Sequence, residues 1–173
     1  FDEGASFLDY EEDWQKKLVD GEGDAVGIEL FCKKKYGKTF GWIGYSLSWS
    51  DRQFSALNGG KQFPFTYDRR HDFKTALTHQ FFRKFDLSFT WMYGTGNAMT
   101  LPIARYQGLN GELITYYDTR NGFRLKDYHR LDAALKCYPG DPLKKKFYIS
   151  LGIFNVYNRK NPYYVYFREA ENG

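Results

Sequence analysis

Apolar and polar residues alternate along most of the chain with a period of two, which is the period of a β-strand whose two faces meet different surroundings. The segment Gly41–Gln53 shows the pattern clearly. Its odd positions carry the apolar residues Ile43, Tyr45, Leu47 and Trp49, whereas glycine, serine and arginine occupy the even positions between them. The same alternation recurs in the segments 26–33, 72–81, 87–94, 130–137 and 147–154. The pattern therefore predicts an all-β fold, an antiparallel meander of about six long strands within residues 24–157.

The connections between these predicted strands are sorted by length. Residues 36–39, 83–85 and 138–144 form short connections, whereas residues 55–69 and 96–126 form long ones. Short periplasmic turns at one end and long extracellular loops at the other are typical of outer-membrane barrels. On this interpretation residues 1–23 form an extracellular loop, residues 158–173 form an outer loop region, and both ends of the chain lie on the outer side.

Aromatic residues make up 20% of the chain and supply much of its apolar character. Several of them, such as Trp42, Trp49, Trp91 and Tyr93, lie near the ends of the strand stripes, where a membrane barrel carries its aromatic girdle. No stretch approaches the roughly 20 apolar residues of a membrane-spanning helix, but a tilted barrel strand needs only about 10 alternating residues. The sequence thus favours a segment of a transmembrane β-barrel. The alternative is a small soluble β-barrel or sandwich that binds a ligand or partner and buries its apolar face as a core.

A series of motifs adds a family resemblance that spans nearly the whole chain. In order they are Gly41–Ser50, Gly60–Asp72, Tyr93–Ala98, Tyr128–Asp132 and Asn155–Pro162. The Tyr-Asp-Arg-Arg-His-Asp run at 67–72 and the Tyr-His-Arg-Leu-Asp run at 128–132 are the most specific. Together they resemble the C-terminal part of the β-barrel of TonB-dependent outer-membrane receptors of the Bacteroidetes type.

The resemblance implies a 22-stranded barrel with a plug domain folded inside it. Such a receptor lies in the cell outer membrane, binds a scarce nutrient outside and imports it with energy from the TonB complex. The plug domain with its TonB box is absent from these residues, and the family's barrel normally ends with one further strand. The expected partners are therefore outer-membrane lipid, the remainder of the barrel and plug, the TonB complex through that plug, and a nutrient ligand of unknown identity. Alone, the segment is expected to have no transport activity.

Candidate ligand contacts lie in the long connection 96–126 and at the rim of the predicted barrel. Aromatic and polar side chains together suit the recognition of a solute, although they equally suit packing within a loop. The candidates are Arg105, Tyr106, Tyr116, Tyr117, Arg120 and Asn121 in the long connection, and Arg70 and Asp72 at the rim. For the mixed-charge run 67–72, a structural ion-pair network is the favoured interpretation over ligand contact.

Catalytic chemistry has little support in the sequence, and the chain is predicted not to be an enzyme. His71 with Asp68 or Asp72 and a serine such as Ser55 is the one candidate set, and no Gly-x-Ser-x-Gly motif accompanies it. The glycine-rich pieces at 58–60 and 94–97 do not precede a helix, so they do not predict a phosphate site.

Metals, cofactors and nucleic acids are not expected either. The histidines His71, His79 and His129 are scattered at odd positions and do not converge with carboxylates. The net charge is +4, and the short basic runs fall at predicted turns rather than on one face with interleaved aromatics. Cys32 and Cys137 fit no metal spacing and are predicted to be reduced thiols.

Overall fold

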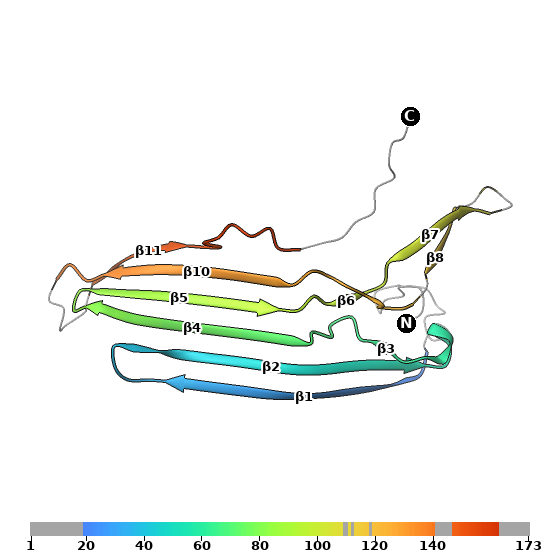
Figure 1. Cartoon of the computed structure of the whole chain (residues 1–173), viewed down its shortest axis with the longest axis horizontal. Helices are drawn as coiled ribbons and strands as arrows, with labels where there is room; N and C mark the ends of the chain where they lie inside the picture. Colours follow the sequence, from blue (N-terminus) through green and yellow to red (C-terminus); the bar gives the residue numbers. More distant parts are fainter. Residues whose placement is uncertain (1–18, 109–110, 112, 118, 141–146, 163–173) are drawn as a thin grey trace, which may run out of the picture. The chain divides into compact units, whose positions relative to one another are not determined.

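The computed structural model describes residues 19–108, 111, 113–117, 119–140 and 147–162. Regular structure in this part of the chain is β-strand, apart from one 3-10 turn, η2 (Asn58–Gly60) (Figure 1). The strands are β1 (Gly21–Lys34), β2 (Thr39–Phe54), β3 (Phe63–Pro64), β4 (His71–Phe82), β5 (Phe85–Gly94), β6 (Ala98–Met99), β7 (Pro102–Gln107), β8 (Leu113–Tyr117), β9 (Phe123–Arg124), β10 (Tyr128–Cys137) and β11 (Ile149–Ile153). The prediction of an all-β fold is confirmed. Within the described ranges, no helix has the length and apolar character that crossing a membrane requires.

The main sheet has the order β1-β2-β4-β5-β10-β11, with the short β3 paired to β2. Its neighbours follow the order of the chain, and the strands pair antiparallel, as a meander requires. Strands β1, β2 and β4 are 14, 16 and 12 residues long, whereas about five or six is usual in globular proteins. The predicted antiparallel meander of long strands is therefore confirmed.

Contacts divide the chain into two units, and the division falls within β1 and β2. We call residues 27–48, 69–96 and 125–162 the sheet unit, and residues 19–26, 49–68 and 97–124 the loop unit.

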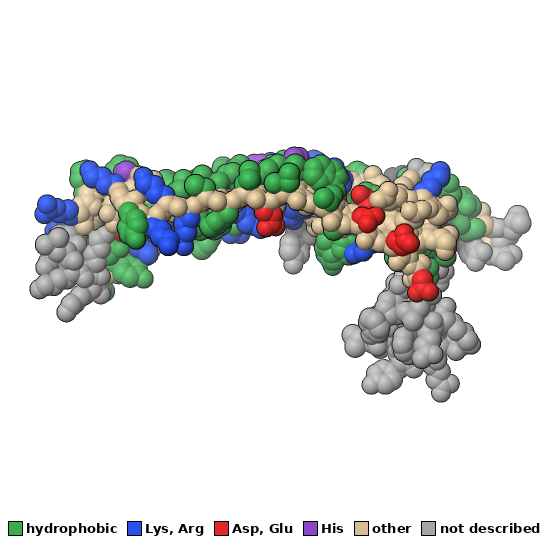
Figure 2. All heavy atoms as spheres, turned by 90° about the horizontal axis from the view of Figure 1, so that it is seen from below, with side chains coloured by type: hydrophobic (Ala, Val, Ile, Leu, Met, Phe, Trp, Pro, Cys, Tyr) green, Lys and Arg blue, Asp and Glu red, His purple; other side chains and the backbone are tan. Residues whose placement is uncertain are grey.

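The register of the sheet unit places odd residues opposite odd residues from β2 to β11, except after a shift in β4 between Gln80 and Phe82, where Phe82 pairs with Phe85. One row across the sheet, for example, joins Leu77 to Phe89, Phe89 to Ala133, and Ala133 to Ile153. Because successive side chains of a strand point to opposite faces, all odd positions of these strands share one face. That face is apolar, and Figure 2 shows hydrophobic side chains gathered along one side of the sheet, together with histidines.

Even residues form the opposite, polar face, and ion pairs lie on it. Lys74 Nζ lies 2.9 Å from Asp72 Oδ1. The Arg130 guanidinium donates to Asp132 Oδ2 through Nε at 3.1 Å and Nη2 at 2.8 Å. The face therefore combines a polar surface with ion pairs between side chains two positions apart on the same strand.

The apolar face has no hydrophobic core beneath it in the described part of the chain. Leu77 and Phe89, near the middle of β4 and β5, are 37% and 40% exposed, and Leu135 of β10 is 42% exposed. The hydrophobic side chains buried among the described residues are Phe63, Ala98 and Tyr138, and none of them belongs to this face. The apolar side of the sheet is thus open to its surroundings.

Three boundaries differ from the sequence prediction. Strand β1 begins at Gly21, three residues before the predicted Asp24. Strand β11 ends at Ile153, whereas the predicted strand region extends to residue 157, because Asn155 and Asn158 adopt positive φ angles of 53° and 51° that turn the chain. The long connection 96–126, predicted as a loop, contains the strands β6 to β9.

Candidate functional site

The predicted ligand contacts fall in two separate parts of the protein. Arg105, Tyr106, Tyr116, Tyr117, Arg120 and Asn121 belong to the loop unit, whereas Arg70 and Asp72 belong to the sheet unit. The structure therefore groups six of the eight residues within one unit.

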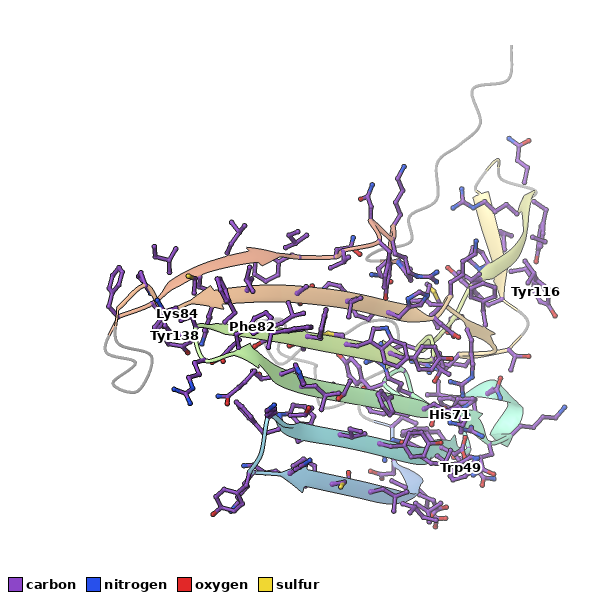
Figure 3. All side chains as sticks on the ribbon, turned by 60° about the vertical axis from the view of Figure 1, so that its left-hand side comes forward. Trp49, His71, Phe82, Lys84, Tyr116 and Tyr138 are labelled. Carbon is purple, nitrogen blue, oxygen red and sulfur yellow. The ribbon has the colours of Figure 1, made fainter. Side chains whose placement is uncertain are left out.

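Four of the six lie on the hairpin of β7 and β8, where Tyr116 is labelled in Figure 3. Tyr106 pairs with Ile114 and Tyr116 pairs with Ala104, so the two tyrosines are diagonal neighbours on one face of the hairpin. Arg105 lies on the opposite face, and a bulge between Pro102 and Ala104 separates its register from that of Tyr117. Tyr106 and Tyr116 are 51% and 49% exposed, which leaves both rings open to a solute.

Asn121 is buried and forms hydrogen bonds within the loop unit. Its side chain is 8% exposed and donates from Nδ2 to the Pro64 carbonyl at 2.8 Å. Its backbone N–H donates to Thr100 Oγ1 at 2.9 Å, and its φ of 54° lies in the left-handed region that asparagine tolerates. These contacts tie three segments of the loop unit together, so Asn121 positions the loop rather than offering its amide outward.

Arg120 contacts other residues of the loop unit and is also partly exposed. Its backbone N–H donates to Asn58 Oδ1 at 3.1 Å, and its guanidinium carbon lies 5.8 Å from the centre of the Phe63 ring. The side chain is therefore half-buried on an aromatic surface, where a guanidinium retains polar edges for another partner.

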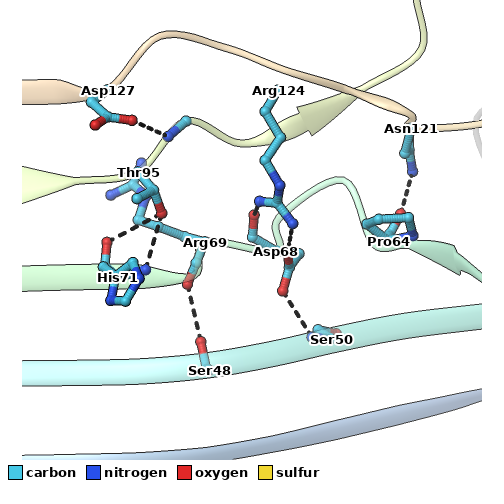
Figure 4. A network of polar contacts seen from close by, with 11 residues as sticks. Ser48, Ser50, Pro64, Asp68, Arg69, His71, Thr95, Asn121, Arg124 and Asp127 are labelled. Atoms are coloured by element: carbon cyan, nitrogen blue, oxygen red, sulfur yellow. Dashed lines mark hydrogen bonds and ion pairs between the residues drawn. The ribbon is translucent and has the colours of Figure 1, made fainter.

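The strongest polar feature of the loop unit is the pair Asp68 and Arg124 (Figure 4). Asp68 is 2% exposed, forms an ion pair with the Arg124 guanidinium and accepts the Ser50 N–H at 2.8 Å. Arg124 Nη1 also donates to the Asp68 carbonyl at 3.1 Å. The pair joins the segment before β4 to β9. Sequence reasoning included Asp68 in the mixed-charge run but missed Arg124, which lies 56 residues away.

Asp72 lies within an ion-pair network, as the favoured interpretation of the mixed-charge run expected. It accepts Arg69 Nη1 at 3.2 Å and Lys74 Nζ at 2.9 Å, and its side chain is 22% exposed. The Arg70 carbonyl accepts the Ser48 N–H at 3.1 Å, beside the bond that Ser48 Oγ donates to the Arg69 carbonyl. These contacts anchor the start of β4 to β2.

Two hollows lie within the loop unit. A cavity of about 650 Å³ is lined by Asp20, Gly21, Glu22, Gln53, Ser55 and Gly60, and a second of about 310 Å³ by Leu101, Pro102, Ile103, Thr119, Gly122 and Phe123. The second is mainly apolar, and Thr119 and Gly122 flank Arg120 and Asn121 in sequence. Small apolar hollows with a few polar groups at the edge suit a small ligand.

The three histidines make contacts on the apolar side of the sheet unit, as their odd positions predicted. His71 Nδ1 lies 2.8 Å from Tyr45 Oη, His129 Nδ1 lies 2.8 Å from Tyr157 Oη, and His79 Nδ1 lies 2.7 Å from Thr39 Oγ1. His71 and Asp72 are consecutive on one strand and point to opposite faces, so they form no catalytic dyad.

An aromatic cluster surrounds two of these histidines. Stacked and tilted ring pairs join Phe73 to Trp91, Trp91 to Tyr93, Tyr93 to His129 and His129 to Tyr157. We call these residues, with Tyr45 and His71, the aromatic belt. It follows adjacent strands of the sheet on the apolar face near the end that leads into the long connections.

Metal ligation and similarity to known proteins give no further assignment. In the described ranges, no group of three or more His, Cys, Asp or Glu side chains could hold a metal ion. Cys32 and Cys137 are both free, and Cys32 is exposed whereas Cys137 is half-buried. The chain matches no protein-family model, no curated protein and no solved structure.

Proposed function

We propose that the chain forms part of the barrel wall and extracellular loops of a TonB-dependent outer-membrane receptor, which binds a scarce nutrient and imports it. The sheet unit is the membrane-spanning wall, and the loop unit is the part that meets the nutrient. The membrane assignment is supported by the sheet, and the receptor class is supported by the motif series in the sequence.

The observation that carries the membrane assignment is the exposed apolar face of the sheet unit. Removing apolar surface from water stabilises a protein by about 25 cal/mol per Å², so a soluble sandwich covers such a face with a second layer. In the described residues nothing covers it, and Ile149, Leu151 and Ile153 on β11 are 58%, 72% and 59% exposed. Acyl chains of a bilayer are the surroundings in which that face is stable.

The polar face supports the same proposal. A barrel of this size has a polar, hydrated interior, and alternation places that interior opposite the lipid face. Asp72 forms an ion pair with Lys74 on this face, and Arg130 forms one with Asp132. Such pairing reduces the free-energy cost of placing charges near a low-dielectric wall.

The aromatic belt supports an interfacial position for the loop-side end of the strands. Tyrosine, tryptophan and histidine rings combine an apolar body with a polar atom, and they are favoured where hydrocarbon meets water. Within the belt the polar atoms bond to one another, as His129 and Tyr157 do at 2.8 Å. The belt then marks the outer boundary of the hydrocarbon region.

The edges of the main sheet explain why the proposal assigns only part of a receptor to this chain. Strands β1 and β11 are the two outermost strands in the sheet order. Unpaired strand edges are too costly in hydrocarbon, so a membrane wall requires pairing on both sides. The remainder of the receptor's own barrel supplies those strands in the proposal, and its plug supplies the contact with the TonB complex.

The nutrient contact is proposed on the hairpin of β7 and β8 and on the apolar hollow beside Arg120. The exposed rings of Tyr106 and Tyr116 offer stacking surface, and Arg105 and Arg120 offer positive charge. Siderophore, haem, cobalamin, glycan and peptide all remain compatible with such a surface.

The test uses the full-length protein that contains this chain. Cell fractionation should recover it in the outer membrane, and extraction should require detergent. Nutrient uptake should be lost when the protein is deleted and, equally, when TonB is deleted, across a panel of haem, cobalamin, ferric siderophores, glycans and peptides. A folded, monomeric protein that needs no detergent would overturn the membrane assignment. Outer-membrane protein with uptake that is independent of TonB would overturn the receptor class alone.

A further inference from the structure

The short connections of the sheet unit carry a concentration of positive charge. Figure 2 shows Lys and Arg side chains gathered at one end of the sheet, and Figure 3 labels Lys84, Phe82 and Tyr138 there. The cations of this end are Lys33, Lys34, Lys35, Lys38, Arg83 and Lys84, and all six are exposed. We call this surface the turn-end patch.

Acidic side chains do not balance these cations. Within residues 33–38, 80–86 and 136–140, Asp86 is the one acidic residue, and it is 6% exposed. Its Oδ2 accepts the Tyr138 hydroxyl at 2.9 Å. Burial, and then this hydrogen bond, raise the pKa of Tyr138, so the phenol stays protonated and adds no negative charge to the surface. The patch therefore presents net positive charge outward.

Backbone bonds hold the separate turns beside one another. The Gln80 N–H donates to the Lys38 carbonyl at 2.8 Å, which joins the connection of β1 and β2 to the end of β4. The Tyr138 N–H donates to the Lys84 carbonyl at 2.9 Å, which joins the connection of β4 and β5 to the end of β10. The cations thus belong to one continuous surface across the sheet, although they are far apart in sequence.

Exposed aromatic rings lie among these cations. Tyr36, Phe82, Phe81 and Tyr148 are 83%, 72%, 55% and 51% exposed. Tyr36 lies between Lys35 and Lys38 in the connection of β1 and β2, and Phe82 directly precedes Arg83 and Lys84. Lysine or arginine beside exposed aromatic rings is the combination that anchors a protein at the surface of a bilayer.

We propose that the turn-end patch binds the anionic headgroups of phospholipids in the membrane leaflet that surrounds the short turns. This inference goes beyond the proposed function and rests on its membrane assignment. The lipid is favoured over nucleic acid because the apolar face continues into the patch, with Cys137 opposite Ile149 and Phe85 in the last row of the sheet. A phospholipid contacts both parts of this surface, its phosphate the cations and its acyl chains the apolar residues. A nucleic acid would leave the apolar part uncovered.

The size of the effect follows from charge alone. One lysine near an anionic membrane surface changes binding by about fivefold at low salt, and salt screens the attraction within about 10 Å. Removal of three patch charges should therefore weaken the preference for an anionic lipid by up to about 100-fold, and by less where the remaining cations compensate.

The experiment compares two matched triple variants of the full-length protein in phosphatidylcholine vesicles. Lys34→Gln, Lys35→Gln and Lys38→Gln remove charge from the patch. Lys61→Gln, Lys126→Gln and Lys160→Gln remove the same charge from exposed lysines outside it. Electron paramagnetic resonance of spin-labelled phosphatidylglycerol and phosphatidylcholine gives the relative association constant of the two lipids with the protein surface.

The unmodified protein and the control variant should both prefer phosphatidylglycerol, and high salt should reduce the preference. The patch variant should have a clearly lower relative association constant than the control variant. Equal preference in all three proteins, or an equal loss in both variants, would overturn the inference. Failure of the unmodified protein to enter the vesicles would instead contradict the proposed function, so the two failures are distinguishable.

Discussion

Replacement of Phe89 by arginine separates a lipid-facing sheet from a water-facing one. Phe89 lies in the middle of β5, opposite Leu77 on β4 and Ala133 on β10, and its side chain is 40% exposed. The matched variant Thr90→Arg places the same charge one residue later, on the polar face opposite Asp132. Residues 89 and 90 are equally central in the sheet. The two variants therefore differ only in the face of the sheet that carries the new arginine.

The magnitude follows from the surroundings of each face. A fully buried phenylalanine side chain contributes about 1.5–3 kcal/mol, and Phe89 is only partly covered, so in water the loss of its packing costs about 1 kcal/mol. Arginine on the lipid face near the bilayer midplane adds about 2–4 kcal/mol. Thr90→Arg should cost less than about 1 kcal/mol, because the new guanidinium meets a polar face and the carboxylate of Asp132.

The assay is equilibrium unfolding in urea of the full-length protein in phospholipid vesicles, followed by tryptophan fluorescence. Phe89→Leu serves as a packing control, since it keeps an apolar side chain and should cost about 1 kcal/mol. Equal free energies of unfolding for Phe89→Arg and Thr90→Arg would refute the assignment of the odd residues to lipid.

Three further predictions concern single contacts. Asp68→Asn should destabilise the loop unit by about 2 kcal/mol, because it leaves the Arg124 guanidinium without its carboxylate, and faster amide hydrogen exchange at Ser50 should report this. Asn121→Ala should cost about 2 kcal/mol in the same exchange measurement, because it removes the bond to Pro64 and forces a non-glycine residue without a polar side chain into positive φ, and Asn121→Gly should cost less. Tyr138 has a raised pKa in the folded protein, so its stabilising effect should be complete below about pH 10 and be lost as the pH rises through the folded pKa. The difference in tyrosinate absorbance between the unmodified protein and Tyr138→Phe should therefore appear only above about pH 10, and a transition below it would contradict the assignment.

The strands and their faces could be predicted from the sequence because alternating side chains of one strand meet two different surroundings, and this alternation is visible within a few residues. In Gly41–Gln53 each large odd residue is followed by a small or polar one. The period of two therefore shows which residues lie on the apolar face of the strand and which lie on the polar face. The short connections fixed the pairing partners, since consecutive strands joined by a few residues pair antiparallel. The register from Thr39 opposite His79 to Leu47 opposite His71 then preserves the parity of the pattern across the sheet.

The organisation of the long connection could not be predicted in this way. Strands β6 and β9 are two residues long each, with Ala98 opposite Arg124 and Met99 opposite Phe123, and two residues show no period. The bond from Arg124 to Asp68 closes over 56 residues, and nothing in either segment specifies the other. Asn121 was predicted as a ligand contact from its residue type, whereas its burial and positive φ are properties of the folded loop.

A nitroxide scan along β10 (Tyr128–Cys137) determines whether the odd face of strands β2 to β11 meets lipid and the even face meets water. Single cysteines replace each residue in turn in a background without Cys32 and Cys137, and the full-length protein is placed in lipid vesicles. Labels at odd positions such as Leu131 and Leu135 should collide mainly with oxygen dissolved in the bilayer. Labels at even positions should collide mainly with a water-soluble nickel complex, so that the two accessibilities alternate out of phase with a period of two. High accessibility to the nickel complex at both odd and even positions would show that the odd face does not meet lipid.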